Sequence, residues 1–212
     1  MKLYVTPTSP YARLMLIVRR EKGLEDRVEV VHTRTRNPDD PLLAVNPSGR
    51  IPFLLLPDGS GFEDTEVLVD YFDALSPPRQ FAVPTGAEYW PFRRILAMAR
   101  SFIDGGSVWG REIIRPEIEQ SPMIIDHEKR RAERLAAFFE SSVVDPPLTE
   151  PGPDQPLNMP QLLLFCALDL ERRVPEFHWR DSCVQLVTWF DRIRSRPSVQ
   201  QAFADAESPR QI

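Results

Sequence analysis

The sequence predicts an α/β unit of βαβ-ββα order followed by an all-helical domain. Three observations predict this fold class: short β-type runs alternate with two helical patterns in the first 75 residues, long helical patterns dominate the remainder, and 42% hydrophobic and 27% charged residues are a globular composition. The 212 residues suffice for two small domains. We expect an α/β domain over residues 1–76, a proline-containing linker over 77–85 and a helical domain over 86–212.

The first three elements form a strand, a helix and a strand. Lys2–Val5 is a short β-type run, and a turn then leads to an apolar-periodic stretch. Ser9 is a favourable N-cap, Pro10 suits the first helical position and Gly23 suits the position after the last turn. Val28–His32 supplies the second strand, so we predict a parallel pair with a right-handed crossover.

The rest of the α/β unit consists of shorter segments. In order, they are a short helix at Pro41–Ala44, a turn at Asn46–Gly49, a strand at Phe53–Leu56, a hairpin turn at Pro57–Gly59, a strand near Phe62 and a helix at Thr65–Leu75.

The second half carries helical patterns. We predict helices at 87–109 and at 122–140, and we interpret the five prolines between Pro146 and Pro156 as a surface loop. Asn158 and Gln161 form a capping box, and Leu162–Leu168 is apolar on every face. This helix therefore belongs at the centre of the helical domain.

Charge and hydropathy disfavour two partner classes. The net charge is −5, and the basic run at Lys129–Arg134 is interleaved with glutamates at helical spacing, so it predicts a solvated helix face and no nucleic-acid partner. The longest apolar run is too short to cross a bilayer, and the N-terminus has no signal-peptide pattern. We expect a cytoplasmic protein without a membrane partner.

The cysteines and histidines do not have the spacing of metal ligands. Cys166 and Cys183 are far apart and without a Cys-x-x-Cys pair, so we expect two core thiols. The histidines, His32, His127 and His178, are scattered. We predict no metal site.

Four motifs follow one another along the chain: Thr8-Ser9-Pro10-Tyr11-Ala12-Arg13, Asn46-Pro47-Ser48-Gly49-Arg50-Ile51-Pro52, Asp64-Thr65, and Trp189 with Arg196-Pro197-Ser198-Val199. Together they resemble the glutathione transferases, and the resemblance covers nearly the whole chain. The first is similar to the active-site turn of Ser- and Cys-type bacterial members. The resemblance implies a thioredoxin-like N-terminal domain, glutathione as cosubstrate, a homodimer and a role in detoxification.

The resemblance also implies roles for five glutathione-binding residues. In the family, the proline of the second motif is cis and the residue before it offers its backbone to the cysteinyl part of glutathione. We therefore expect a cis Pro52 preceded by a binding Ile51, although only about 5% of X-Pro bonds are cis. Arg50 stands where lysine is usual and pairs with the glycyl carboxylate, or it is an exposed loop residue.

Asp64 and Thr65 stand where the family carries Glu-Ser. Thr65 opens a helix whose N-terminus can hold the γ-glutamyl carboxylate. Asp64 is expected to contact the amino group of the tripeptide, with a shorter reach than glutamate.

The chemistry of such a site is the stabilisation of a thiolate. A free thiol has a pKa of about 8.5, so lowering it by two units requires about 2.7 kcal/mol. Ser9 is our catalytic candidate because a hydroxyl at a helix start adds a hydrogen bond to the favourable end of the helix dipole. Thr8 is the rival donor, and the structural alternative for Ser9 is a plain N-cap.

We expect the electrophile pocket between the two domains. Thr8 and Tyr11 from the Ser9 turn, with Phe102 and Trp109 on the first long helix of the second half, are its candidate residues. Phe102 and Trp109 lie seven positions apart on one helix face, a spacing that is also typical of core aromatics.

The predicted function is transfer of a small hydrophobic electrophile to glutathione sulfur. The alternatives are a non-catalytic binder of glutathione or a hydrophobic ligand, and a glutathione-dependent lyase, isomerase or peroxidase. Glutaredoxin-like exchange would need a cysteine in place of Ser9, and a serine hydrolase would need a Gly-x-Ser-x-Gly elbow, which the sequence lacks.

Overall fold

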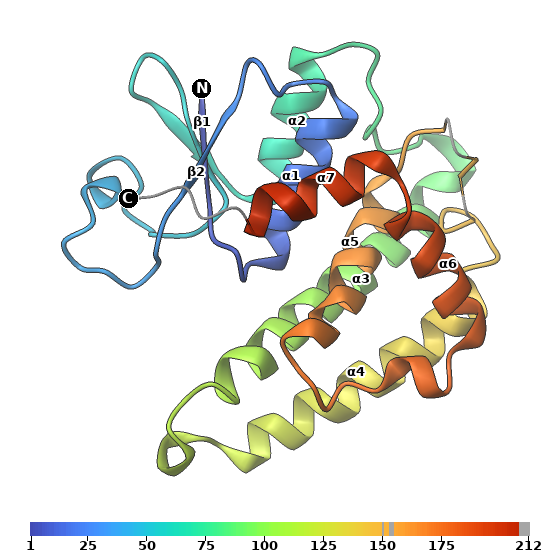
Figure 1. The fold of residues 1–212 in the computed structure, drawn as a ribbon. Helices are drawn as coiled ribbons and strands as arrows, with labels where there is room; N and C mark the ends of the chain where they lie inside the picture. The colour runs from blue at the N-terminus through green and yellow to red at the C-terminus, as the bar shows by residue number, and fades with distance from the viewer. Residues whose placement is uncertain (150, 153–154, 208–212) are drawn as a thin grey trace. The chain divides into compact units, whose positions relative to one another are not determined.

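The protein consists of two units (Figure 1). A computed structural model describes residues 1–149, 151–152 and 155–207. The first unit combines Met1–Ala82 with the chain from Arg196 on, and the second is Val83–Ser195. The first division falls inside the expected linker. The second was not expected from the sequence, because residues from 196 on were assigned to the helical domain.

The first unit is built on a four-stranded mixed sheet of order β2-β1-β3-β4. β1 and β2 are parallel, as predicted from the βαβ unit, and β3 and β4 are antiparallel, as predicted from the hairpin turn. β1 and β3 are also antiparallel, a pairing that was not predicted. Its elements are β1 (Lys2–Val5), α1 (Pro10–Glu21), β2 (Glu29–His32), the 3-10 helix η1 (Pro41–Ala44), β3 (Phe53–Leu55), β4 (Gly61–Glu63), α2 (Thr65–Leu75) and α7 (Pro197–Glu207).

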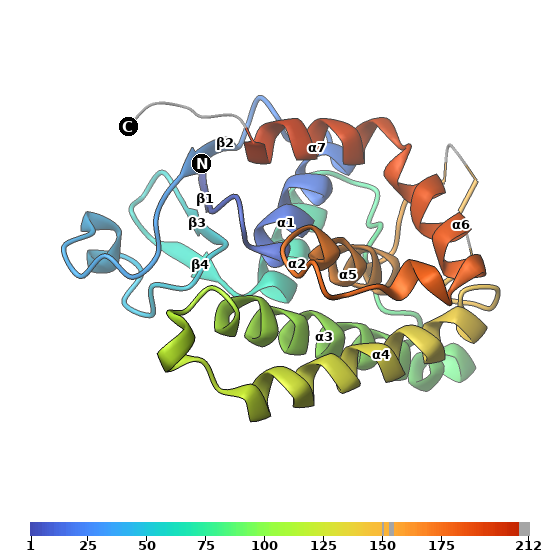
Figure 2. The ribbon, with the colours of Figure 1, turned by 60° about the horizontal axis from the view of Figure 1, so that its bottom comes forward.

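Helix α1 is the central element of this unit. Residues 14–18 are buried without interruption. Such all-round burial needs partners on several sides, and the sheet, α2 and α7 supply them (Figures 1 and 2). At its C-terminal end, Glu21 accepts a hydrogen bond from Ser198 and lies 3.5 Å from the Arg196 guanidinium, which ties the start of α7 to α1.

A buried ion pair fixes the segment that follows α2. Lys22 Nζ donates to Asp73 Oδ1 at 2.8 Å and to the carbonyl oxygen of Pro78 at 2.7 Å. The two Asp73 oxygens also accept the backbone N–H groups of Gln80 and Phe81. Burial would raise the pKa of Asp73, but these hydrogen bonds outweigh it and hold the pKa below its ordinary value.

The second unit is helical among its described residues. Its elements are η2 (Gly86–Glu88), α3 (Tyr89–Glu112), η3 (Glu117–Glu119), α4 (Pro122–Ser142), α5 (Met159–Leu168), η4 (Asp169–Arg172), η5 (Trp179–Asp181) and α6 (Val184–Arg194). α3 and α4 form an antiparallel pair, and α5 packs against α3 (Figure 2). Every residue of α5 is buried, and the Asn158–Gln161 capping box is present, as predicted.

The proline-rich loop before α5 is anchored to the second unit. Leu148 is fully buried, and its carbonyl oxygen accepts the indole N–H of Trp189 at 2.8 Å. The predicted surface loop at Pro146–Pro156 therefore has a buried anchor. Residues 150, 153 and 154 of this stretch lie outside the described residues.

The expected core thiols are confirmed. Cys166 and Cys183 are both buried. Burial raises the pKa of the Cys183 thiol. Along the described part of the chain, no helix combines the length and apolarity that a bilayer crossing needs.

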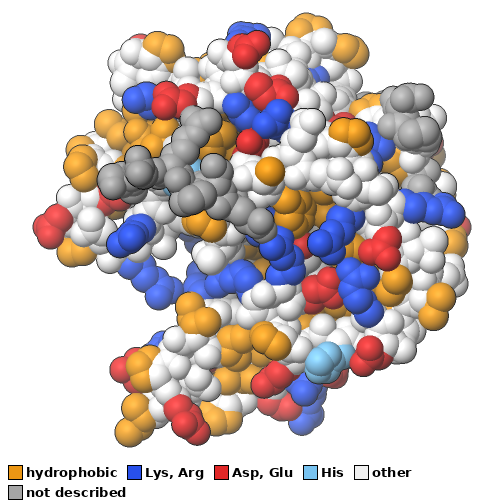
Figure 3. All heavy atoms as spheres, in the orientation of Figure 1, with side chains coloured by type: hydrophobic (Ala, Val, Ile, Leu, Met, Phe, Trp, Pro, Cys, Tyr) orange, Lys and Arg blue, Asp and Glu red, His pale blue; other side chains and the backbone are white. Residues whose placement is uncertain are grey.

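The connection between α3 and α4 exposes apolar side chains. Ile114, Ile118 and Met123 are 67%, 96% and 78% exposed. Hydrophobic and acidic side chains lie together at this end of the second unit, at the lower left of Figure 3.

Candidate functional site

Three segments singled out from the sequence converge at one end of the sheet. The Ser9 turn follows the last residue of β1, and Pro52 immediately precedes β3. Tyr4 pairs with Phe53 and Phe53 pairs with Glu63, so the end of β1, the start of β3 and the end of β4 are neighbours. Strand pairing alone therefore brings the Ser9 turn, the Asn46–Pro52 loop and the Asp64–Thr65 pair together.

Ser9 has the predicted N-cap conformation, with φ −82° and ψ 121°. Its Oγ accepts the backbone N–H of Ala12 at 3.1 Å, and its own N–H donates to Thr6 O at 3.3 Å. Within the described residues the Ser9 hydroxyl makes this one hydrogen bond, as an acceptor. Because the O–H proton remains available, Ser9 can cap α1 and donate to a ligand at the same time.

Thr8 and Tyr11 flank Ser9 in different environments. Thr8 is exposed in the turn, and Tyr11 is half-buried in the first turn of α1. Ser9 itself is half-buried. Of the two candidate hydroxyl donors, only Ser9 is the N-cap of α1, where the partial positive charge of the helix is greatest.

The loop before β3 is organised by a buried asparagine. Asn46 is 1% exposed, donates from Nδ2 to Arg50 O at 2.9 Å and accepts the Ser48 hydroxyl. Gly49 takes the left-handed conformation at φ 61°, which favours glycine. The sequence motif thus encodes a rigid loop, and the fixing role of Asn46 was not singled out from the sequence.

The residues at the end of this loop are placed as the motif predicts. The Ile51–Pro52 peptide bond is cis. Pro52 is buried and Ile51 is half-buried. The Arg50 side chain is exposed and contacts no acidic group of the described chain.

Asp64 and Thr65 form the junction between β4 and α2. Thr65 is the first residue of α2, as predicted. Asp64 is the N-cap, and its Oδ1 accepts the N–H groups of Glu66 at 2.9 Å and Val67 at 3.5 Å. The Asp64 carboxylate therefore already occupies part of the helix N-terminus that we expected to hold a ligand carboxylate.

The Asp64 backbone is in an uncommon conformation. Its φ of 73° with ψ of 126° lies where L-residues other than glycine are rare. Such a conformation is retained where surrounding structure enforces it, often at functional sites. The capping role could have been found from the sequence, because aspartate is among the preferred N-cap residues. The backbone conformation could not.

Phe102 and Trp109 lie in the core of the second unit. They are 2% and 1% exposed. The ring centroid of Phe177 is 5.7 Å from that of Phe102 and 6.0 Å from that of Trp109, and Phe102 also stacks on Phe139. This placement favours the core interpretation over the pocket-lining one, because both rings are enclosed by aromatic neighbours of their own unit.

The described residues contain no cluster of three or more His, Cys, Asp or Glu side chains placed to hold a metal ion. The polar groups at this end of the sheet include backbone N–H groups, the Ser9 hydroxyl, the exposed Arg50 and the Asp64 carboxylate.

Sequence comparison connects this arrangement to known proteins. Residues 3–80 match the family model described as Glutathione S-transferase, N-terminal domain. The uncharacterized GST-like protein YibF of Escherichia coli is 27% identical over 213 residues, covering 99% of this chain and 100% of the relative. Glutathione S-transferase 2 of Saccharomyces cerevisiae is 24% identical over 212 residues, covering 95% and 88%. The similarity thus extends well beyond the N-terminal segment.

Comparison with solved structures finds proteins of the same fold. A glutathione transferase family member from Pseudomonas fluorescens Pf-5 with bound glutathione has a TM-score of 0.82 and 25% identity, covering 95% of this chain and 97% of that chain. With bound S-(propanoic acid)-glutathione, the TM-score is 0.79 at 24% identity, covering 95% and 98%. The predicted fold class, a thioredoxin-like unit followed by a helical region, is confirmed.

Proposed function

We propose that this chain is a member of the glutathione transferase family, and that it binds glutathione and activates the thiol for attack on a small hydrophobic electrophile. The thiol proton is lost to solvent, the thiolate sulfur forms a bond to the electrophilic carbon, and the bond from that carbon to its leaving group, a halide in an aryl halide, breaks as the halide departs with the electron pair. Glutathione is a cosubstrate in this scheme. The observation that carries the proposal is the Ser9 hydroxyl, which caps α1 and keeps its own proton free to donate.

In this proposal Ser9 stabilises the thiolate. A hydrogen bond from the hydroxyl and the positive end of the α1 dipole each contribute on the order of 1 kcal/mol. Together they supply most of the roughly 2.7 kcal/mol that a two-unit decrease in thiol pKa requires. Thr8 is the alternative hydrogen-bond donor to the thiolate, but it is not the N-cap of α1.

The remainder of glutathione is bound by the other two segments. The backbone of Ile51, before the cis Pro52, pairs with the cysteinyl part. The exposed Arg50 guanidinium attracts the glycyl carboxylate. Thr65 at the start of α2 faces the γ-glutamyl carboxylate, and Asp64 faces the amino group.

The electrophile site is proposed to lie beside the Ser9 turn, with Thr8 and Tyr11 as its first candidate residues. A relative that binds glutathione carrying a propanoic acid group on sulfur supports a small substituent at that place. We do not include Phe102 and Trp109, since both are enclosed in the core of the second unit.

A second candidate function, glutathione binding without turnover, is favoured by Asp64. Its carboxylate already accepts two N–H groups at the start of α2. A ligand carboxylate approaching the same helix end would meet a like charge, which lowers affinity and loosens the alignment of the thiol.

Conjugation kinetics test the proposal. Ser9→Gly removes the hydroxyl while costing only a few tenths of a kcal/mol as a cap, and Ser121→Gly, at the N-cap of α4, is the matched control. We expect Ser9→Gly to lower kcat/KM for an activated aryl halide by about tenfold, or 1.4 kcal/mol, and Ser121→Gly to stay within twofold; Thr8→Val tests the alternative donor. Glutathione binding with no turnover in the wild type would favour the second candidate. A larger loss in Thr8→Val would reassign the donor.

The proposal also includes a cytoplasmic homodimer, as in the family. Light scattering of the purified protein at several concentrations measures the mass directly, and a monomer throughout would remove the dimer from the scheme.

A further inference from the structure

Arg13 in α1 follows Ser9 by one helical turn. Its Nη2 reaches back and donates to the carbonyl oxygen of Pro7 at 3.3 Å. The same guanidinium lies 4.6 Å from the ring centroid of Phe203 in α7. Arg13 thus spans the turn that presents Ser9, and its other face rests on a residue 190 positions later.

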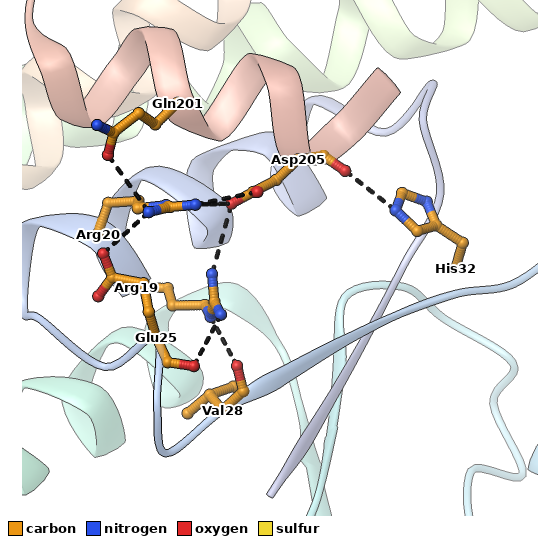
Figure 4. A network of polar contacts seen from close by, with 7 residues as sticks. All are labelled: Arg19, Arg20, Glu25, Val28, His32, Gln201 and Asp205. Atoms are coloured by element: carbon orange, nitrogen blue, oxygen red, sulfur yellow. Dashed lines mark hydrogen bonds and ion pairs between the residues drawn. The ribbon is translucent and has the colours of Figure 1, made fainter. Parts of the chain in front are cut away.

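The position of Phe203 depends on how α7 is held against α1. Figure 4 shows the polar network that holds it. Both Asp205 oxygens accept hydrogen bonds from Arg20 Nη2, at 3.0 and 2.9 Å, and Arg19 lies 3.4 Å from the same carboxylate. The Nε2 atom of His32, at the end of β2, lies 3.0 Å from the Asp205 carbonyl oxygen.

This network is partly shielded from water. The side chains of Arg19, Arg20 and Asp205 are 9%, 22% and 26% exposed. Charge-assisted, two-point pairing of this kind restricts orientation as well as distance. These contacts fix the position of α7 against α1, and they therefore also fix the position of the Phe203 ring against which the Arg13 guanidinium packs.

We propose that Arg13 is a positioning residue, which holds the Ser9 turn in its active geometry and is itself held by Phe203 of α7. The inference rests on the proposed function, because it assigns α7 to the glutathione-activating half of the molecule. Arginine suits this role because its planar guanidinium can donate to a carbonyl group and lie against an aromatic face at once. Lysine can reproduce the charge but not the planar contact.

The expected consequence is a loss of alignment with little loss of binding. When the Arg13 side chain no longer bonds to the Pro7 carbonyl oxygen, the Ser9 hydroxyl samples more orientations. A smaller fraction of these orientations places the hydroxyl against the thiol sulfur. A displacement of about 1 Å at a reacting group can cost up to a hundredfold in rate. We therefore expect kcat to fall while KM for glutathione changes little.

The test uses the full chain with substitutions at both ends of the contact. Arg13→Met and Phe203→Leu remove the cation and the aromatic face at similar volume, and Arg13→Lys is the conservative rescue. Arg94→Met is the matched control, because Arg94 lies 5.4 Å from the Phe138 ring in the second unit. We expect kcat to fall about tenfold in Arg13→Met, severalfold in Phe203→Leu and least in Arg13→Lys, with KM for glutathione within twofold.

Hydrogen exchange of the free protein supplies a readout that does not need turnover. The Ala12 amide, bonded to Ser9 Oγ, should exchange faster in Arg13→Met and Phe203→Leu but not in Arg94→Met. Unchanged exchange, or a kcat equal to that of Arg94→Met, would overturn the positioning role. A wild type that binds glutathione without turnover would count against the proposed function, while the exchange data would still decide the role of Arg13.

Discussion

At the residue scale, two residues of the candidate site cap helices. Ser9 was predicted to be a thiolate donor or a plain N-cap, and the cap is confirmed while the donor role stays a prediction. Asp64 was expected to contact the amino group of the tripeptide, which also stays a prediction, and its carboxylate caps α2, a role that was not identified from the sequence. A sequence motif specifies residue types, but it does not say whether the Asp64 carboxylate will accept the backbone N–H groups of its own helix or contact a ligand.

The conformation of Asp64 yields a stability prediction. Asp64→Ala removes the cap and keeps a β-carbon at φ 73°, so the free energy of unfolding should fall by about 1–2 kcal/mol. Asp64→Gly should cost only a few tenths, because glycine tolerates both the cap position and the positive φ. Urea unfolding measures both. Equal losses in the two variants would show that backbone conformation has no part in the effect.

At the element scale, the sequence predicted the helices and strands well, because their apolar periodicity and caps are local. α2 begins and ends where expected, and α3 and α4 differ from the expectation by about one turn or less at each end. The pairing of α7 with α1 was not predicted. The pairing depends on ion pairs that join Arg19 and Arg20 to Asp205. Because Asp205 lies far from the two arginines in sequence, no local pattern indicates that these residues meet.

Two glycines of α3 provide a matched pair for a packing prediction. A Cβ at Gly106 would approach Leu170 Cδ1 to 2.5 Å, whereas one at Gly110 would meet Val174 at an ordinary 3.5 Å. Gly110→Ala should therefore stabilise the protein by up to about 1 kcal/mol, the gain of alanine over glycine in a helix. Gly106→Ala should be less stable than Gly110→Ala by about 1 kcal/mol or more, because buried Leu170 must shift.

Thermal unfolding of both glycine variants under identical conditions is the measurement. If Gly106→Ala is the more stable of the two, the close approach of Leu170 to α3 does not limit packing.

The buried pair of Lys22 and Asp73 gives a prediction with a defined pH dependence. Their side chains are 3% and 2% exposed. Asp73→Asn leaves Lys22 buried without its counter-charge, so the free energy of unfolding at pH 7 should fall by about 3–5 kcal/mol. Asp70→Asn, at an exposed position on the same helix, is the control.

The pH dependence follows from the lowered pKa of Asp73 in the folded state. The unfolded state takes up the proton first, at a pKa of about 3.9. The contribution of Asp73 is therefore complete above that pH and is lost as the pH falls towards the lower folded-state pKa. Urea titrations between pH 3 and pH 7 should show a shallower acid loss in Asp73→Asn than in the control. Parallel curves would contradict the assignment.

At the scale of the whole molecule, sequence motifs predicted the fold class and the segments that converge at one end of the sheet. They placed Phe102 and Trp109 less well, because a seven-residue spacing describes one helix face and does not say whether that face meets a ligand or the core. The structure buries both rings beside Phe177, and Phe102 also stacks on Phe139.

Ligand binding should be visible in the stability of the entire chain. Reduced glutathione at 100 times its dissociation constant adds about 2.7 kcal/mol of apparent stability. For 212 residues this corresponds to a rise in Tm of roughly 5–10 °C. Differential scanning calorimetry with glutathione, and with its oxidised dimer as a control, measures the shift. No rise with millimolar glutathione would remove the ligand from the proposed function.

The return of α7 to α1 has a consequence for biosynthesis. The first unit needs a helix that the ribosome makes only after the whole of residues 83–195, whereas the second unit is continuous in sequence. During translation the first unit therefore cannot complete its folding until α7 has been made, and until then the side of α1 that packs against α7 stays uncovered. The second unit can fold earlier. Nascent chains stalled before residue 196 should leave the N-terminal segment sensitive to protease, and its protection should appear when α7 emerges.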